Sequence, residues 1–325
     1  MPTAKATALT WTWSDALRCG LCTLPAALIV LTGDPSRGLA WAVGILPAAV
    51  IGLAPQRKAR IRLVFVGLLF ALSILLGSLL IHTDVTAVVG IFAVALGSAL
   101  LASRRAFGLV AMSLCAPVAA IGLSYPDTTK ALSLGLIVLT GSVFSYAVSL
   151  LYPEPRTDSA APQSHLLPSA MAAPYGIRLG LAAGIATAIG IAIGTDHVGW
   201  APAAALFVMR PTKEMQELRS IGRLVSVLLG ASGAVVFLRL TPSSELVAVL
   251  AVLAIAGAAG TRGSRWYVTP FFTTFLVLVM LLYASPTVAN EQWRFAERVG
   301  ETALGVGLAY FFGLLLPRLF RRRTA

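Results

Sequence analysis

Four arginines in matching positions of the two halves of the chain are the residues whose types and spacing could do chemistry. Arg18 and Arg178 each lie near the start of a long apolar run, and Arg62 and Arg223 begin a later run in each half. A guanidinium group binds a carboxylate through two parallel hydrogen bonds, and a ring of such groups concentrates anions in a water-poor pore mouth. The four residues therefore predict a binding site for organic anions. The alternative is that each contacts lipid phosphates and only sets the topology.

A second candidate site lies in a short apolar stretch, residues 198–209, which is followed by Arg210. A helix of that length reaches roughly 18 Å, whereas the hydrocarbon core of a bilayer is about 30 Å thick. The corresponding stretch of the first half, residues 39–54, is also short and contains Pro47. Paired short or Pro-interrupted helices indicate a binding site, because their ends present unpaired backbone groups at depth. The substrate contacts predicted from these stretches are Arg210, Lys213, Trp200 and Trp41.

Two carboxylates, Glu301 and Asp15, are the candidates for carrying a proton. Glu301 lies a few residues inside the last apolar run and three residues after Arg298. An ionisable group at that depth is a candidate for proton coupling, although an interfacial ion pair with Arg298 or Arg294 would also explain it. Asp15, three residues before Arg18, is a shallower case that a local partnership at a helix start also explains. We predict Glu301 as the main coupling residue.

The histidines and cysteines give weaker signals. His82 and His197 can titrate near neutral pH, but we interpret both as surface-loop residues at the membrane end opposite to most of the cations. Cys19, Cys22 and Cys115 lie in apolar runs, which argues against structural disulfides and favours a role in helix packing. No catalytic triad, phosphate-binding glycine loop or metal cluster is legible, so we predict neither an enzymatic activity nor a metal or cofactor.

The composition is that of a membrane protein. Of the 325 residues, 58% are hydrophobic and only 12% are charged, and the mean hydropathy is +0.85. A soluble protein could not bury so much apolar surface in one core, so the lipid bilayer must be the solvent. The net charge of +12 could suit nucleic acid, but the cations lie in short loops between apolar runs, so we predict no nucleic-acid partner.

Apolar runs that could cross or nearly cross a bilayer occur about six times in each half of the chain. They are continuous and longer than the roughly ten alternating residues of a barrel strand, so they predict an all-α, polytopic membrane protein with about twelve transmembrane helices. The runs lie at about 16–31, 39–54, 62–81, 86–102, 107–123, 131–152, 176–194, 198–209, 223–238, 245–260, 267–284 and 299–317.

The two halves also resemble each other in sequence. The tripeptide Arg-Leu-Val at 62–64 recurs at 223–225, an offset of 161 residues, and Gly141 recurs as Gly305, an offset of 164. Such a duplication predicts two parallel six-helix repeats with a transport pathway between them. The predicted domains are a first repeat at 1–152, a Pro/Ser-rich cytoplasmic connector at 153–175 and a second repeat at 176–325.

The distribution of charge predicts the orientation. Most cations lie at alternate membrane ends, and the acidic residues gather at the opposite ends. Because cytoplasmic loops carry an excess of Lys and Arg, we predict that the N- and C-termini of this multi-pass protein are both cytoplasmic. Two G-x-x-x-G pairs, Gly180 with Gly184 and Gly190 with Gly194, predict close helix–helix contacts along the seventh run.

One pattern in the second half resembles a known family. Trp200, an apolar run, Arg210-Pro211, Arg219, Arg223 and Gly230 together resemble the fusaric acid resistance (FUSC) family, also called aromatic acid exporters. The closing stretch from Arg298 through Gly305 to Pro317 is similar to that family as well. The resemblance is clearest over residues 176–318 and weaker in the first half.

The resemblance implies export of aromatic or other organic carboxylic acids across a bacterial inner (plasma) membrane, driven by the proton gradient as proton antiport. It implies a small organic anion as the substrate and, as in some members, a periplasmic adaptor subunit as a partner. Plant malate channels are distant relatives whose six-span subunits pair as dimers, which makes a homodimer a further candidate assembly. Many members carry a sizeable cytosolic domain between the halves, whereas this chain has only the connector.

Three functional hypotheses follow. The first is a transporter in which cytoplasmic arginines gather the anion and Glu301 carries the proton. The second is a passive organic-anion channel, which needs only the arginine ring and a water-filled pore. The third is a membrane scaffold without transport, which a dry interior of interlocked apolar side chains would favour. The side chains that offer stacking surfaces to an aromatic substrate are Trp200, Trp41, Trp266, Tyr267, Phe271 and Phe272.

Overall fold

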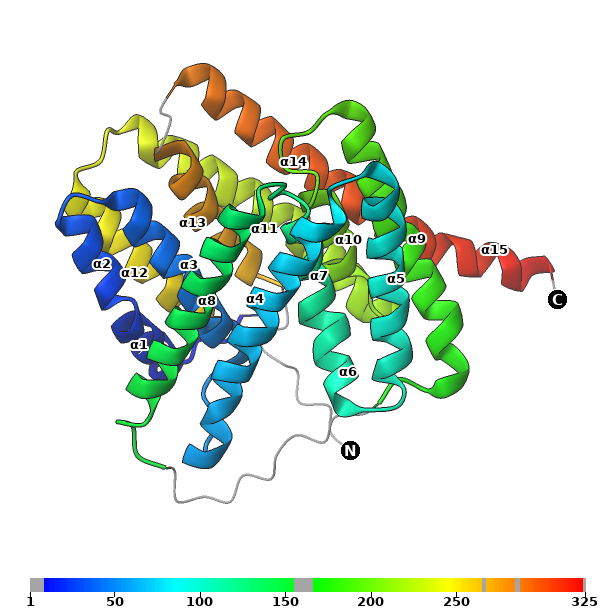
Figure 1. Ribbon diagram of the computed structural model, residues 1–325, viewed down its shortest axis with the longest axis horizontal. Helices are drawn as coiled ribbons and strands as arrows, with labels where there is room; N and C mark the ends of the chain where they lie inside the picture. The colour runs from blue at the N-terminus through cyan, green and yellow to red at the C-terminus, as the bar shows by residue number, and fades with distance from the viewer. Residues whose placement is uncertain (1–8, 155–165, 265–266, 284–286, 324–325) are drawn as a thin grey trace. The chain divides into compact units, whose positions relative to one another are not determined.

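The computed structural model describes residues 9–154, 166–264, 267–283 and 287–323, and within these ranges the chain forms helices joined by turns and short loops (Figure 1). The protein is an all-α, polytopic membrane protein, as the sequence predicts. Trp266, one of the candidate stacking residues, and residues 155–165 of the predicted connector lie outside the described residues.

Six helices of the described residues are long and apolar enough to cross a membrane. A seventh span exists if the bent pair α1 (Trp13–Cys22) and α2 (Leu24–Leu31) counts as one. The structure therefore supports six or seven spans rather than the predicted twelve. The six are η1 with α4 (Arg57–Leu80), α5 (Asp84–Ala102), α8 (Thr128–Ser149), α9 (Ser169–Ile193), α11 (Lys213–Arg239) and the continuous run that contains α14 (Ala289–Leu319).

The remaining apolar runs are helices that are shorter than a full span. At 1.5 Å per residue, a helix of 17 residues reaches only about 26 Å, and one of nine residues about 14 Å. Hydropathy counts such runs as spans because it registers apolar character and not the turns that end a helix. The shorter helices are α3 (Pro35–Ile51), α6 to α7 (Ala106–Gly122), α10 (Trp200–Val208), α12 (Ser244–Gly260) and α13 (Thr269–Tyr283).

Prolines account for the irregular places in the helices. α1 and α2 meet at 43° just before Pro25, which cannot donate a backbone hydrogen bond to the preceding turn. Two π-helical turns, η2 (Ala111–Cys115) and η3 (Phe311–Leu315), each end two residues before a proline, Pro117 or Pro317. The wider π turn accommodates the proline ring and its missing N–H without ending the helix. The segments that follow are α7 (Ala116–Gly122) and α15 (Leu316–Arg323), and α14 (Val288–Tyr310) precedes η3.

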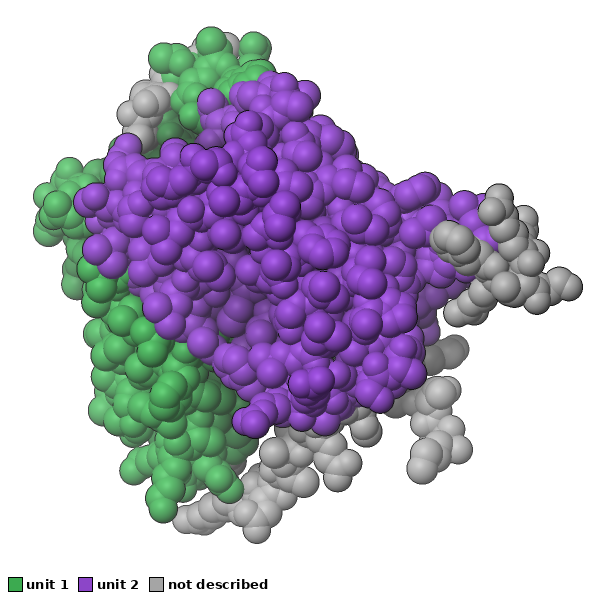
Figure 2. Space-filling view, turned by 45° about the vertical axis from the view of Figure 1, so that its right-hand side comes forward, with its two compact units in different colours: residues 1–68, 136–159, 225–296 green, residues 69–135, 160–224, 297–325 purple. Residues whose placement is uncertain are grey.

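The internal contacts divide the chain into two compact units, shown in Figure 2. Unit 1 comprises residues 1–68, 136–159 and 225–296, and unit 2 comprises residues 69–135, 160–224 and 297–325. The boundaries fall inside α4, α8, α11 and α14, so each unit contains segments from both halves of the sequence. The predicted domain division at 152 and 176 and the two six-helix repeats stay predictions.

In unit 1, α12 packs against α1, α2, α3 and α13. α3 also crosses α8 at a pair of glycines, where a Cβ on Gly44 would lie 2.6 Å from the Ile137 carbonyl oxygen. A Cβ on Gly141 would likewise lie 2.5 Å from the carbonyl oxygen of Gly44. Small residues at a crossing let the two backbones approach, which is the usual way helices associate in a membrane.

In unit 2, α5 packs along the length of α9, and α10 packs against α7 and α9. The predicted contact of Gly180 and Gly184 is present, because both face Val88 or Phe92 of α5. Gly194 has a different role, since its left-handed backbone (φ 67°) ends α9. The core between these helices is rich in alanine, whose small side chain lets the helix backbones approach closely. Residues 194–199 form the turn that leads from α9 into α10.

Candidate functional site

Three ionisable residues of α14, Glu297, Arg298 and Glu301, lie buried in unit 2. Their exposed fractions are 6%, 8% and 3%. Glu297 and Glu301 are one helical turn apart and so share a face of the helix. A buried charge is costly unless it is paired, and ionisable groups within a membrane span typically serve a function. These residues therefore mark the candidate site.

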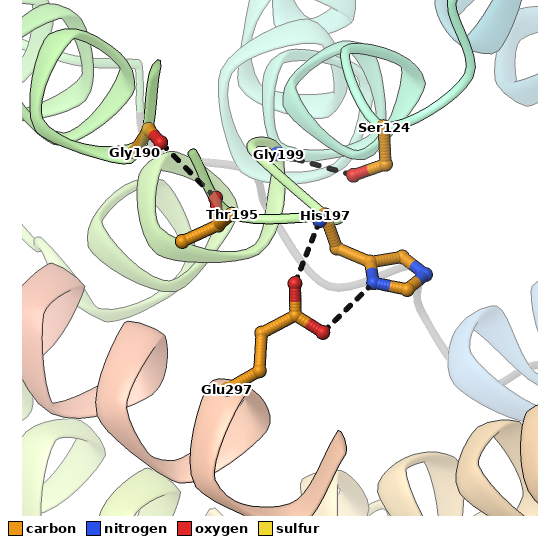
Figure 3. A network of polar contacts seen from close by, with 6 residues as sticks. All are labelled: Ser124, Gly190, Thr195, His197, Gly199 and Glu297. Carbon is orange, nitrogen blue, oxygen red and sulfur yellow. Dashed lines mark hydrogen bonds and ion pairs between the residues drawn. The ribbon is translucent and has the colours of Figure 1, made fainter. Parts of the chain in front are cut away.

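Glu297 binds the turn that leads into α10 through two contacts with His197 (Figure 3). One carboxylate oxygen accepts a hydrogen bond from the backbone N–H of His197 at 2.8 Å, and the other lies 3.1 Å from Nδ1 of its ring. The second ring nitrogen points away from Glu297. The sequence interpretation of His197 as an ordinary surface-loop residue is therefore wrong, because its side chain is only 13% exposed and faces a buried carboxylate.

The same turn is held on its other side by α7 and the turn that follows it. The backbone N–H of Gly199 donates to the Ser124 hydroxyl at 3.1 Å. A Cβ on Gly199 would lie 2.1 Å from the carbonyl oxygen of Ala120, so only glycine permits this approach. Thr195 donates from its hydroxyl to the Gly190 carbonyl at 3.3 Å, which ties the turn to the end of α9 (Figure 3). The position of His197 is thus fixed from three sides.

Trp200, the first residue of α10, brings the histidine and an arginine together. Its ring stacks on the His197 ring with 4.1 Å between centroids and 10° between planes. The guanidinium carbon of Arg298 lies over the Trp200 ring, 4.6 Å from its centroid. A cation over an indole face is stabilised by the ring quadrupole, most strongly where water is excluded. Trp200 is itself only 4% exposed.

A second buried arginine, Arg223 of α11, completes the group. Its guanidinium lies over the Phe207 ring, 5.1 Å from the centroid, and it interacts electrostatically with Arg298. The Thr195 hydroxyl approaches the Glu301 carboxyl, yet neither carboxyl oxygen makes a hydrogen bond of full geometry to a described residue. We call His197, Trp200, Arg223, Glu297, Arg298 and Glu301 the buried charge cluster.

The buried charge cluster combines the groups that anion binding and proton transfer need. Two guanidinium groups on aromatic faces can bind a carboxylate, and the indole offers apolar contact to an organic substrate. Glu301, Glu297 and His197 can bind and release protons. Of the predicted site residues, Trp200, Arg223 and Glu301 lie together here.

The other predicted cations of unit 2 make local contacts. Arg210 donates to the carbonyls of Leu206 and Met209 at the end of α10, at 3.3 and 2.8 Å. Lys213 forms an exposed ion pair with Glu217, one turn along α11, at 3.7 Å. Arg178 donates from Nε to the Pro174 carbonyl at 3.1 Å. Their role in substrate binding stays a prediction.

In unit 1, the predicted residues Arg18 and Asp15 line a small cavity of about 30 Å³. Arg18 lies over the ring of Tyr152, 5.0 Å from its centroid, and Asp15 pairs with Arg262 at 2.7 Å. Burial raises the pKa of the Tyr152 phenol, and the positive charge of Arg18 opposes that rise. The cavity is large enough for about one water molecule and not for an organic acid.

The remaining predicted residues of unit 1 have structural neighbours. Arg62 reaches the carbonyl of Gly52, with 3.4 Å between Nη2 and oxygen, and Trp41 packs edge-on against Phe144 with 5.9 Å between centroids. Four predicted arginines were expected to face a common axis. Arg18 and Arg62 belong to unit 1, whereas Arg178 and Arg223 belong to unit 2, so a single ring of four stays a prediction.

Sequence comparison shows a similarity between part of the second half and a known family. Residues 181–317 match the model of the family described as Fusaric acid resistance protein-like. We call residues 181–317, which are similar to that family, the fusaric acid resistance protein-like domain. No curated protein and no solved structure matches the chain. Every residue of the buried charge cluster lies inside the fusaric acid resistance protein-like domain, and the match is consistent with a membrane transporter.

Sequence reasoning missed Glu297 and Arg298 and gave His197 too little weight. The available signal was the spacing of Glu297 and Glu301, which places two carboxylates on one face of a helix where the last apolar run begins. His197 and Glu297 are 100 residues apart, so no local pattern indicates their contact. Arg60 was also missed in unit 1, where its buried guanidinium donates to five backbone carbonyls.

Proposed function

We propose that the protein exports aromatic or other organic carboxylates across a bacterial inner membrane, coupled to the proton gradient. The observation that carries the proposal is the buried charge cluster of the fusaric acid resistance protein-like domain. It combines two guanidinium groups, an indole and three titratable side chains in a protein that crosses the membrane several times. Such a combination is costly to bury and has no purpose in a purely structural core.

Arg298 and Arg223 are the anion-binding residues of the proposal. Arg298 lies over Trp200 and Arg223 over Phe207, so each guanidinium keeps a fixed plane. A carboxylate placed between two fixed guanidinium groups gains charge-assisted hydrogen bonds, and an attached aromatic ring gains apolar contact with the indole. The predicted cytoplasmic arginines Arg18, Arg62 and Arg178 then act earlier, by raising the local concentration of anions.

Glu301 is the proton-binding residue of the proposal. Its carboxyl is buried beside Arg298 and interacts electrostatically with Glu297 and Asp196 as well. Neutralising Glu301 removes a negative charge next to Arg298, so local electrostatics alone would make the proton and the anion bind together. Antiport therefore requires a conformational step that separates the two binding events, with the anion released before the proton is taken up.

The test is flux into proteoliposomes of benzoates, fusaric acid and dicarboxylates, with and without an imposed pH difference. We expect uptake of at least one carboxylate above its equilibrium level when the pH difference is present. Glu301→Gln should abolish that accumulation and leave downhill flux intact. If the wild-type protein moves carboxylates only downhill and indifferently to the pH difference, the protein is a passive anion channel. If it moves none of them, the transport proposal is overturned.

A matched control uses a third buried glutamate of α14, Glu291, which pairs with Arg239 at 3.3 Å in unit 1. Glu291→Gln changes the same atoms on the same helix but lies outside the buried charge cluster. It should leave both downhill flux and pH-driven accumulation at the wild-type level, which shows that a loss in Glu301→Gln reports the site rather than the helix.

A further inference from the structure

Anion binding does not explain why His197 and Glu297 belong to the buried charge cluster. Glu297 is adjacent in sequence to Arg298 and one turn from Glu301, yet both of its carboxylate oxygens face His197. His197 is partly exposed on a turn, whereas the side chain of Glu297 is 1% exposed. The three titratable groups thus form a series that runs from a partly exposed side chain to a deeply buried one.

The hydrogen bonds of His197 fix how its ring can carry a proton. With Glu297 ionised, Nδ1 donates to Glu297, so the neutral ring leaves Nε2 as an acceptor that points away from the carboxylate (Figure 3). The ring cannot turn freely, because it stacks on Trp200 at 4.1 Å. The Nδ1 edge of the imidazole is therefore held against an acceptor, while its Nε2 edge faces away from that acceptor.

We propose that His197 and Glu297 form a proton relay that connects the external solution with Glu301. This inference rests on the proposed function and names the route by which its proton arrives. Nε2 of His197 takes a proton from water, and the proton on Nδ1 passes to the Glu297 carboxylate. After its carboxyl group turns toward Glu301, one helical turn away, Glu297 passes a proton to Glu301, and exchange of the ring protons with water restores the starting tautomer. One proton enters and one reaches Glu301, so the charge balances at each transfer.

The surroundings favour movement of a proton along this series. Two carboxylates one helical turn apart repel each other when both are ionised, and a single proton bound to either of them removes this repulsion. Arg298 and Arg223 are the cations that face the cluster, and Asp196 is the exposed acid at its outer edge. On the α7 side the turn meets the uncharged hydroxyl of Ser124. The predicted topology puts the turn at the external membrane surface, where a proton-driven exporter takes up its proton.

The test separates a relay from a merely structural contact by replacing His197 with an amide, in His197→Asn and in His197→Gln, and comparing each variant with wild type. The amide of Asn can donate to Glu297 from nearly the position of Nδ1, so it keeps the contact but cannot carry a proton. In proteoliposomes we expect both variants to lower pH-driven accumulation by about tenfold or more, in line with the effect of removing a proton-transfer group. Downhill counterflow of the same carboxylate should stay within about twofold of wild type, because the anion-binding arginines are untouched.

His82→Asn is the matched control. His82 is another histidine of a turn in unit 2, and its Nδ1 lies 3.1 Å from the Leu79 carbonyl oxygen on the exposed surface. It should retain wild-type accumulation. Rescue of accumulation by His197→Asn would overturn the relay, because it would show that the contact is structural. If Glu301→Gln abolishes accumulation and both His197 variants keep it, the relay fails while the proposed function stands.

A second measurement does not depend on transport. A protonated imidazole stacked on an indole quenches its fluorescence, so the emission of Trp200, taken as wild type minus Trp200→Phe, should fall as the external pH is lowered. The pH response should disappear in His197→Asn and shift to lower pH in Glu297→Gln, because the protonated ring then loses the neighbouring negative charge that favours it. A Trp200 emission that is flat with pH, in a protein that accumulates carboxylate normally, would also overturn the relay.

Discussion

Two buried arginines, Arg60 of unit 1 and Arg298 of unit 2, show how differently one residue type is used in this protein. Arg60 donates to five backbone carbonyl oxygens at 2.5 to 3.2 Å. Arg298 lies over an indole and interacts with carboxylates that can change their charge. Backbone carbonyls cannot titrate or move away, so the first arginine is fixed, whereas the partners of the second can change. Burial alone therefore does not identify a functional arginine; the nature of its partners does.

The surroundings of Arg60 explain its structural role. Its guanidinium collects the carbonyls that the end of α8 and the turn before η1 (Arg57–Ile61) leave without intrahelical partners. A Lys side chain could not replace it, because an ammonium group has no planar fork of five donors. The carbonyl oxygens that accept these hydrogen bonds belong to Ala54, Pro55, Ser149, Tyr152 and Pro153.

The largest expected effect is on stability, from Arg60→Met. Removing the charged donor leaves several buried carbonyls without a partner, which should lower the free energy of unfolding by about 3 kcal/mol or more. Thermal unfolding in detergent measures the loss. Flux per folded molecule should stay at the wild-type level, since Arg60 belongs to unit 1 and the buried charge cluster to unit 2. Arg57→Met is the control, because in Arg57 it is the backbone N–H that binds Glu154. A stable Arg60→Met protein would break the comparison.

The second expected effect is on transport, from Arg298→Gln. Truncating one partner of a buried charge group costs several kcal/mol, so carboxylate flux should fall by about 100-fold. Arg298→Lys keeps the charge but loses the planar face on Trp200, and we expect a loss of about tenfold. Both are measured as initial rates in proteoliposomes, normalised to folded protein. Equal flux in Arg298→Gln and wild type would mean that this arginine, like Arg60, is only structural.

A smaller effect is expected on affinity, from Glu301→Gln. Removing the carboxylate charge beside Arg298 should tighten binding of an organic anion at neutral pH by roughly three- to tenfold, because the guanidinium is then less neutralised. Equilibrium binding of a radiolabelled carboxylate to detergent-solubilised protein measures this. The variant should also lose the pH dependence of that binding. Weaker binding in Glu301→Gln would show that Glu301 contacts the substrate rather than competing with it.

The smallest effects are expected from exposed ion pairs, one in each unit. Arg37 pairs with Asp34 at 3.4 Å in unit 1, and Lys130 pairs with Asp127 at 4.0 Å in unit 2. Their side chains are 73% and 77% exposed, so Arg37→Ala and Lys130→Ala should each change the free energy of unfolding by less than about 1 kcal/mol. Chemical denaturation measures both. A large loss in either would show that the units differ at their surfaces as well as in their interiors.

The prediction of twelve spans shows where local patterns stop being sufficient. The runs at 39–54 and 245–260 are as apolar as the true spans, yet α3 and α12 are too short to count as spans. Their short length follows from turns at Gly52 and Thr261, and the Gly52 turn contacts Arg262, a residue far away in the sequence. Hydropathy reports how strongly a segment is excluded from water, whereas the length of a helix depends on the tertiary contacts at its ends.

The candidate site was partly predictable. Glu301, Trp200 and Arg223 were found because each is an unusual residue in an apolar stretch, and that signal is local. Arg18, Arg62 and Arg178 were selected by the same rule, but their contacts are with an aromatic ring or with backbone carbonyls. The rule detects a charged residue near the membrane without knowing its partner. Whether the partner is a carbonyl or a carboxylate decides the function.

The sequence by itself determined that the chain is helical and that it lies in a membrane. These properties depend on the solvation of each segment and on its own backbone, so they can be read from neighbouring residues. Only the tertiary structure decided that His197 faces Glu297 and that Arg60 is enclosed by carbonyls. Those contacts join segments that are distant in the chain, and their formation depends on how several helices pack at once.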